Sequence, residues 1–143
     1  HRARRMPEFN VADGQKVIDT VMVPWLDDLK MTVEEVSETG AVVRLPWNGR
    51  IARDGGLITG QALMSFADAA MVVVISSAIG GFQKMATIDM NTSFLAPAYN
   101  TDVIARGSVI KRGKRMIFGR IDLETADTAI PVALVQTTWT LLG

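Results

Sequence analysis

A single carboxylate stands inside the most apolar stretch of the chain. Between Gly55 and Gln83 the one formally charged side chain is Asp68, which has alanines on both sides and a run of Met, Val and Ile after it. An ionised carboxylate in apolar surroundings is costly unless specific groups hold it. Asp68 is therefore a candidate general base or nucleophile. The alternative is a structural carboxylate that neighbouring N–H or hydroxyl groups satisfy.

Gly60 stands eight residues before Asp68, at the start of the same stretch. The first N–H groups of a helix are unpaired and the helix dipole favours negative charge there. Because glycine has no side chain, a carbonyl oxygen could approach this N–H closely and be polarised by it. At about 1.5 Å per residue, however, Gly60 lies about 12 Å from the Asp68 of its own helix, too far for both to act on one carbonyl. Gly60 could also be a simple glycine at a helix start.

The composition excludes several kinds of catalytic centre. The 143 residues include no cysteine, and the single histidine is His1. Disulfides, thiol nucleophiles and cysteine-ligated zinc are thereby excluded, and histidine-based triads lose their central residue. Lys+Arg and Asp+Glu both total 15, so no excess of positive charge points to nucleic acid. We expect no metal, no bound cofactor and a cytoplasmic location.

The N-terminus and the apolar stretch do not read as membrane signals. The basic cluster Arg2, Arg4 and Arg5 is not followed by an apolar region, so it is interpreted as a solvated tail and not a secretory signal. Residues 60–79 have the length of a membrane span, but polar side chains interrupt them. The interrupting residues are Gln61, Ser65, Asp68, Ser76 and Ser77.

The hydrophobic pattern predicts an α+β fold. The apolar stretch has helical length and ends at Gly80-Gly81, and residues 9–29 contain a short helix that stops near Pro24. Strands are expected on both sides of the long helix, and residues 48–56 form a loop. The expected strands span residues 31–37, 40–47, 84–95, 101–112, 114–125 and 129–142. A helix that is apolar around most of its circumference must be covered, so we expect a curved antiparallel sheet wrapped around it.

Three stretches carry a resemblance to a known family. They are TGQALMSFADAA, ATIDMNTSFLAPA and VIKRGKRMIFGRIDL, which occur in this order between residues 59 and 123. Over residues 40–142 the chain resembles the hotdog-fold acyl-CoA thioesterases of the PaaI-like (phenylacetate-degradation) type. The resemblance implies one hotdog domain over 1–143, with an N-terminal segment 1–30 and a core 31–143. It also implies hydrolysis of acyl-CoA thioesters to free acid and CoA.

The resemblance assigns roles to particular residues. The Gly60–Asp68 spacing is the one this family uses, and Thr87 stands where the family has a Ser or Thr that hydrogen-bonds the water or the carboxylate. In such enzymes the acidic residue of one subunit faces the glycine of another, so a homodimer is required and a homotetramer is expected. The family usually has His-Gly-Gly where Thr59-Gly60-Gln61 stands, and often an Asn where Arg53 stands. Thr59, Gln61 and Arg53 are therefore candidate substrate contacts.

Four cations surround a turn glycine in the third stretch. Lys111, Arg112, Lys114 and Arg115, around Gly113, could clamp the phosphates of CoA, or could form a solvated hairpin end. Two other functions remain open: a hotdog protein that binds an acyl ligand without turning it over, and a purely structural oligomer. The lone carboxylate favours the enzyme, whereas the absent His and Asn favour the binding protein.

Overall fold

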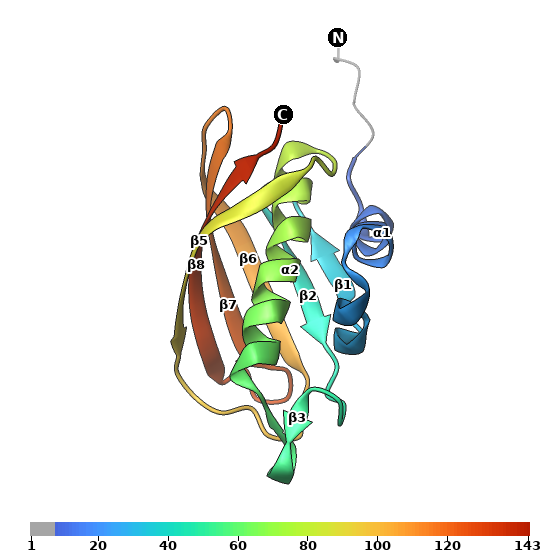
Figure 1. Ribbon diagram of the computed structural model, residues 1–143, viewed down its shortest axis with the longest axis vertical. Helices are drawn as coiled ribbons and strands as arrows, with labels where there is room; N and C mark the ends of the chain where they lie inside the picture. Colours follow the sequence, from blue (N-terminus) through green and yellow to red (C-terminus); the bar gives the residue numbers. More distant parts are fainter. Residues whose placement is uncertain (1–7) are drawn as a thin grey trace.

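The computed structural model describes residues 8–143, and His1 and the cluster Arg2, Arg4 and Arg5 lie outside this range (Figure 1). A six-stranded sheet has the strand order β1-β2-β6-β7-β8-β5, and each pair of adjacent strands is antiparallel. The expected curved antiparallel sheet is confirmed, with strand ends within about two residues of those expected. The strands are β1 Thr32–Val36, β2 Gly40–Leu45, β5 Met85–Phe94, β6 Val103–Arg112, β7 Met116–Thr125 and β8 Pro131–Leu141.

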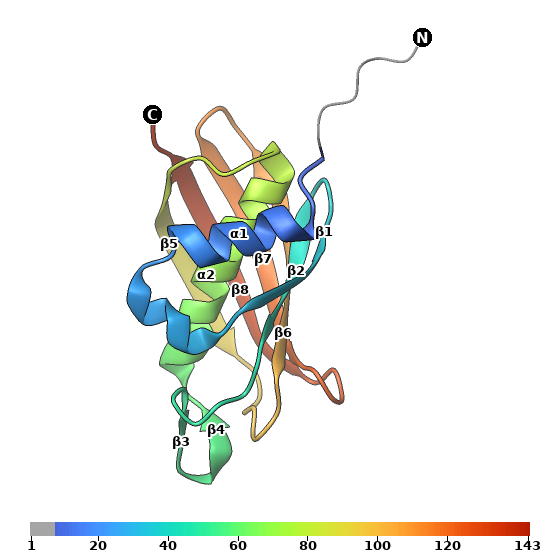
Figure 2. The ribbon, with the colours of Figure 1, turned by 90° about the vertical axis from the view of Figure 1, so that its right-hand side faces the viewer.

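The long helix α2, Gly60–Ile79, lies in the concave face of the sheet (Figures 1 and 2). It begins where the Thr59 hydroxyl accepts a hydrogen bond from the Ala62 N–H, and it ends at Gly80, whose φ of 86° is left-handed. By length and composition the helix could cross a membrane, but 67% of its apolar stretch is buried inside the fold. That burial is the environment of a core helix.

Two glycines of the sheet let α2 approach closely. A Cβ built on Gly107 would lie 2.6 Å from a methyl carbon of Val74, and one on Gly119 would lie 2.4 Å from the end of Met71. Because both sheet positions lack side chains, the helix packs directly against the strands there. This contact sets how closely the buried face of α2 lies to β6 and β7.

A second helix covers another side of α2. Helix α1, Val11–Val21, starts with a capping box between Asn10 and Asp13 and crosses α2 (Figure 2). At Gly14 the two elements come so close that an added Cβ would lie 3.2 Å from Val33 and 3.3 Å from Val73. A 3₁₀ turn, η1 Pro24–Leu29, then leads into β1, which agrees with the helix expected to stop near Pro24.

The segment before α2 was expected as a loop, but it contains a small hairpin. Strands β3, Ala52–Arg53, and β4, Leu57–Ile58, pair across the short turn η2, Asp54–Gly56. The prediction missed this hairpin because two-residue strands carry no detectable alternation. Nearby, the Arg50 guanidinium donates to the Asp28 carboxylate and holds the pKa of that carboxyl below its usual value.

Candidate active site

One stripe of α2 is only partly covered by the rest of residues 8–143. Its side chains are exposed or half-buried, whereas most others on the helix are buried. Their spacing of three or four residues places them on one face of the helix. Asp68 lies near the middle of this open stripe, which runs from the start of α2 to its centre. The stripe consists of Gln61, Met64, Ser65, Asp68 and Val72.

Asp68 has a hydrogen-bond partner on the edge strand β5. The Thr87 hydroxyl donates to Oδ1 of Asp68 over 2.8 Å. This answers how the carboxylate is held: a hydroxyl from the neighbouring strand satisfies one oxygen, while the half-exposed position keeps the group in contact with solvent. The structure therefore brings together two of the three predicted catalytic residues.

A β-bulge lies directly beside this contact. Thr87 pairs with Trp139 and Asp89 pairs with Thr138, so Ile88 is an extra residue in the strand. In a regular strand Thr87 and Met90 would face opposite sides of the sheet. Because Ile88 is the extra residue, Thr87 can reach α2 while Met90 still lies opposite the buried Thr137.

Gly60 lies at the start of the open stripe, and Asp68 lies near its middle. It is the first residue of α2, and its N–H has no hydrogen-bond partner among residues 8–143, since Thr59 caps the N–H of Ala62. A Cβ at Gly60 would lie 3.5 Å from the ring of Phe94, at the end of β5. At about 1.5 Å per residue, eight residues separate Gly60 from Asp68 by about 12 Å. One chain alone does not join them.

The three candidate substrate contacts at the start of α2 lie in different surroundings. Thr59 uses its hydroxyl as the helix cap, and Gln61 is exposed in the first turn. Arg53 is exposed on β3 and lines an open cavity of about 520 Å³ with three neighbours. Those neighbours are Asp54, Leu57 and Tyr99.

The predicted cationic hairpin tip is a tight turn at the end of the sheet where α2 also ends (Figure 1). Lys111 and Arg112 end β6, Lys114 and Arg115 precede β7, and all four side chains are exposed. The sequence did not identify Lys84 as a neighbour of this end. The Leu142 N–H donates to the Lys84 carbonyl, and the Leu141 N–H donates to the Arg115 carbonyl. The end of β8 therefore lies next to the backbone of both basic residues.

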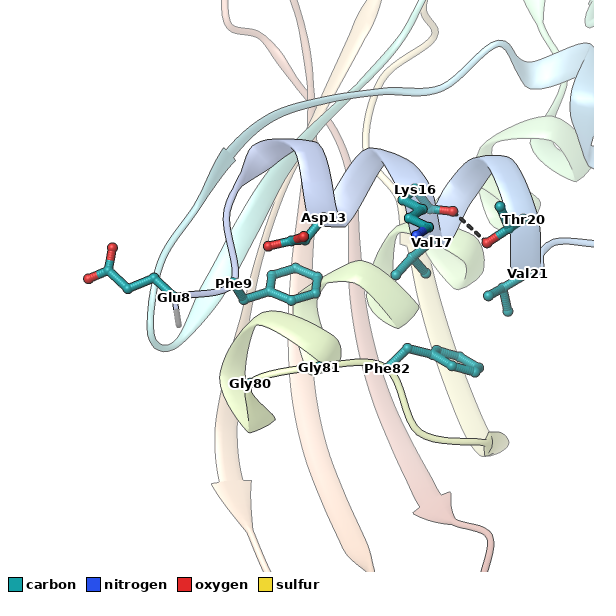
Figure 3. Close-up of a pocket in the computed structure, with 10 residues that line it drawn as sticks. All are labelled: Glu8, Phe9, Asp13, Lys16, Val17, Thr20, Val21, Gly80, Gly81 and Phe82. Carbon is teal, nitrogen blue, oxygen red and sulfur yellow. Dashed lines mark hydrogen bonds between the residues drawn. The ribbon is translucent and has the colours of Figure 1, made fainter. Parts of the chain in front are cut away.

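A second cavity, of about 400 Å³, lies between α1 and the segment after α2 (Figure 3). Phe82 lines this cavity, and Met64 lies on the open stripe. Phe66 and Met71 are fully buried and belong to the core. The sequence gave no signal for this cavity, because its walls come from segments about seventy residues apart.

Comparison with known proteins identifies the family of this chain. A family model described as the thioesterase superfamily matches residues 55–132, more than half of the chain. The chain belongs to the thioesterase superfamily. A Halobacterium salinarum protein that carries a provisional esterase name is 32% identical over 136 residues, which cover 87% of each protein. A Thermoplasma acidophilum protein with a similar name is 25% identical over 119 residues, 83% of this chain and 86% of that protein.

Solved structures agree with this superfamily assignment. The E. coli PaaI protein of the phenylacetic acid degradation operon superposes with a TM-score of 0.77 at 17% identity, covering 93% of this chain and 96% of that one. A hypothetical thioesterase from Streptococcus pneumoniae, solved with coenzyme A, gives a TM-score of 0.71 at 15% identity, covering 79% and 86%. The hotdog fold and the PaaI-like resemblance are confirmed. Membership in the superfamily supports ester or thioester hydrolysis as the activity.

Proposed function

We propose that this thioesterase-superfamily protein hydrolyses acyl-CoA thioesters to the free acid and CoA, as a homodimer or a tetramer of two such dimers. The observation that carries the proposal is the hydrogen bond from Thr87 to Asp68 on the open stripe of α2. It holds one carboxylate oxygen in place and leaves Oδ2 available to a water or a thioester carbon.

The placement of the two half-sites along β5 supports the homodimer. Asp68 contacts Thr87 near the beginning of β5, and Gly60 lies against Phe94 at its end. Among residues 8–143, β5 is also an edge strand whose outer backbone groups have no paired strand. If two β5 edges pair antiparallel about a two-fold axis through the middle of the strand, each Asp68 approaches the Gly60 of the partner subunit.

The chemistry then follows from the two half-sites. The N–H of the partner subunit's Gly60 would donate to the thioester carbonyl oxygen and stabilise the negative charge that develops there; one such donor is worth about 10²–10³ in rate. Asp68 would remove a proton from an attacking water or attack the carbonyl carbon directly. Thr87 would keep the carboxylate in the orientation that either step requires. If Asp68 acts as the base, the CoA thiolate leaves as the free acid forms and takes up the proton that Asp68 removed from the water. If Asp68 attacks directly, the thiolate leaves an anhydride between the acyl group and Asp68, which a water then hydrolyses to the free acid and the regenerated carboxylate.

Two features support CoA as the leaving group. The cations of the hairpin tip and Arg53 offer positive charge for a polyanion, and the similar S. pneumoniae structure contains coenzyme A. The proposed reaction uses no metal or prosthetic group, and a cytoplasmic location suits a CoA thioester.

A specific observation keeps a second function open. Thr59 stands in place of the histidine in the resembled family; its hydroxyl accepts from the Ala62 N–H and donates to the Ile51 carbonyl. It is therefore poorly placed to help fix a substrate carbonyl. A protein that binds an acyl-CoA without cleaving it would tolerate this arrangement.

A thiol-release assay over a panel of acyl-CoAs tests the proposal. We expect wild type to release CoA from at least one thioester, and Asp68→Asn to lose at least about 10²-fold in kcat while its oligomeric state stays unchanged. Full turnover by Asp68→Asn would make Asp68 a structural residue. No release by wild type from any thioester, with CoA still bound, would favour the binding protein.

A further inference from the structure

The cavity between α1 and the α2–β5 connection has the shape of a slot with aromatic ends. Phe9 lies at one end and Phe82 toward the other, with Val17 of α1 between them and Val21 beyond Phe82 (Figure 3). We call this slot the α1 groove. Its volume of about 400 Å³ is in the range of small-ligand sites. The remaining lining residues are Glu8, Asp13, Lys16, Thr20, Gly80 and Gly81.

Two glycines form part of the wall opposite α1. A Cβ built on Gly80 or Gly81 would meet nothing within 4 Å, so space is open above both glycines. Phe82, directly after them, leaves 38% of its surface exposed. A slot with glycines in its wall and accessible aromatic rings suits a planar ring system. Every nucleotide base has a flat face that can stack on an aromatic side chain.

Charge varies along the α1 groove. Figure 3 places the carboxylates of Glu8 and Asp13 near the Phe9 end and Lys16 of α1 closer to Phe82. Lys84, which does not line the groove, follows Phe82 by two residues in the sequence. Hydrogen-bond acceptors at the first end suit the exocyclic amine of a base. The cation after Phe82 suits a phosphate. The order of charges therefore matches a nucleotide whose base points toward Glu8 and whose phosphates point toward β5.

The groove is close in sequence to the strand that carries Thr87. Lys84 immediately precedes β5, and Thr87 follows three residues later, about 10 Å away in an extended strand. A flexible arm that leaves the thioester at Asp68 and Thr87 could follow the beginning of β5 to Lys84. The ligand of the proposed reaction has this layout, since the pantetheine arm of CoA joins the thioester to a diphosphate and then to adenosine.

We propose that the α1 groove binds the adenine nucleotide end of CoA, with the base between Phe9 and Phe82 and a phosphate at Lys84. The inference rests on the proposed function for its ligand. It differs from the hairpin tip as a binding place, because it assigns the nucleotide to the α1 side of the molecule.

Calorimetric affinities for CoA and for phosphopantetheine, which lacks the nucleotide, test the proposal without any turnover. We expect Phe82→Ala to weaken CoA binding about tenfold by removing the stacking surface, with phosphopantetheine affinity unchanged. Lys84→Ala should weaken CoA binding several-fold, and the loss should shrink as salt rises. Phe118→Ala is the matched control: this side chain is also 38% exposed, but it lies on the opposite face of the sheet, opposite Thr138.

Each outcome decides between the binding places. Unchanged CoA affinity in Phe82→Ala overturns the proposal, and a loss confined to Lys111→Ala with Arg112→Ala assigns the nucleotide to the tip instead. If Phe82→Ala lowers the melting temperature, Phe82→Leu, which keeps an apolar side chain but no ring, should still show the loss for CoA alone. Nucleotide-dependent CoA binding without thioester cleavage would overturn the proposed function and leave the groove standing.

Discussion

The two faces of α2 differ in what their side chains contact. The buried face packs apolar side chains such as Met71 and Val74 onto sheet glycines, and every contact it needs lies within one chain. The open stripe carries Asp68 at its centre, with Gly60 at the helix start, and these two groups are too far apart to act together in that chain. Packing and the proposed chemistry are thus separated on one helix. Substitutions on the two faces should have separable effects on stability and on rate.

Mixed dimers give the largest expected effect, because they test whether the open stripe needs a partner. Asp68→Asn chains and Gly60→Pro chains should each be almost inactive as homodimers. In a mixed dimer one site combines the intact Asp68 with the intact Gly60. Random pairing makes half of the dimers mixed, each with one complete site, so about a quarter of wild-type activity should return. The thiol-release rate after mixing measures this recovery.

The proline substitution suits its position. Gly60 is the first helical residue, where proline is favoured, and Thr59 has the extended conformation that a residue before proline adopts. The change therefore removes the N–H without disturbing the helix, which circular dichroism should verify. Verified mixed dimers without recovered activity would place the whole site within one chain.

The buried face gives an effect of the other kind. Gly107→Ala would place its Cβ 2.6 Å from Val74, a rigid β-branched neighbour, and should lower the free energy of unfolding by about 1–3 kcal/mol. The value of kcat below the melting temperature should stay within about twofold of wild type, because the open stripe is untouched. Gly49→Ala is the control, since its Cβ would meet nothing within 4 Å. Urea unfolding of both variants measures the difference.

The sequence predicted the buried face better than the open one. Helix and strand positions follow from hydrophobic periodicity and from stop signals such as Gly80, which act within a short window. The lone carboxylate also marked the site, because its cost in apolar surroundings is visible from composition. The contact between Asp68 and Thr87 followed from the family resemblance, since no local pattern fixes which hydroxyl of β5 faces α2.

Features built from distant segments had no signal in the sequence. The bulge at Ile88 is set by the pairing of β5 with β8, and a shift of one residue changes the face of every side chain beyond it. The α1 groove combines residues near 10 and near 80. Lys84 belongs to a stretch whose pattern predicts only a strand. Such features depend on tertiary register, which no single stretch of sequence encodes.

The smallest expected effect comes from the hydroxyl that connects the edge strand to the open stripe. Thr87→Val keeps the shape of the side chain and removes its donor, and a hydrogen bond to a charged group is worth about 1.5 kcal/mol or more. We therefore expect kcat to fall about tenfold. The free energy of unfolding should fall by up to about 1.5 kcal/mol, because the same hydrogen bond is lost from the folded protein.

Two further variants separate the hydrogen bond from packing. Thr87→Ser keeps the hydroxyl and loses the methyl group, so it should retain most of the activity. Thr138→Val removes a hydroxyl from β8 at the position opposite Asp89 and should leave kcat unchanged. Equal rates for wild type and Thr87→Val would show that the Asp68 carboxylate does not depend on this bond. A large loss in Thr87→Ser would mean that the methyl group, and hence the packing of β5 against α2, positions Asp68 instead.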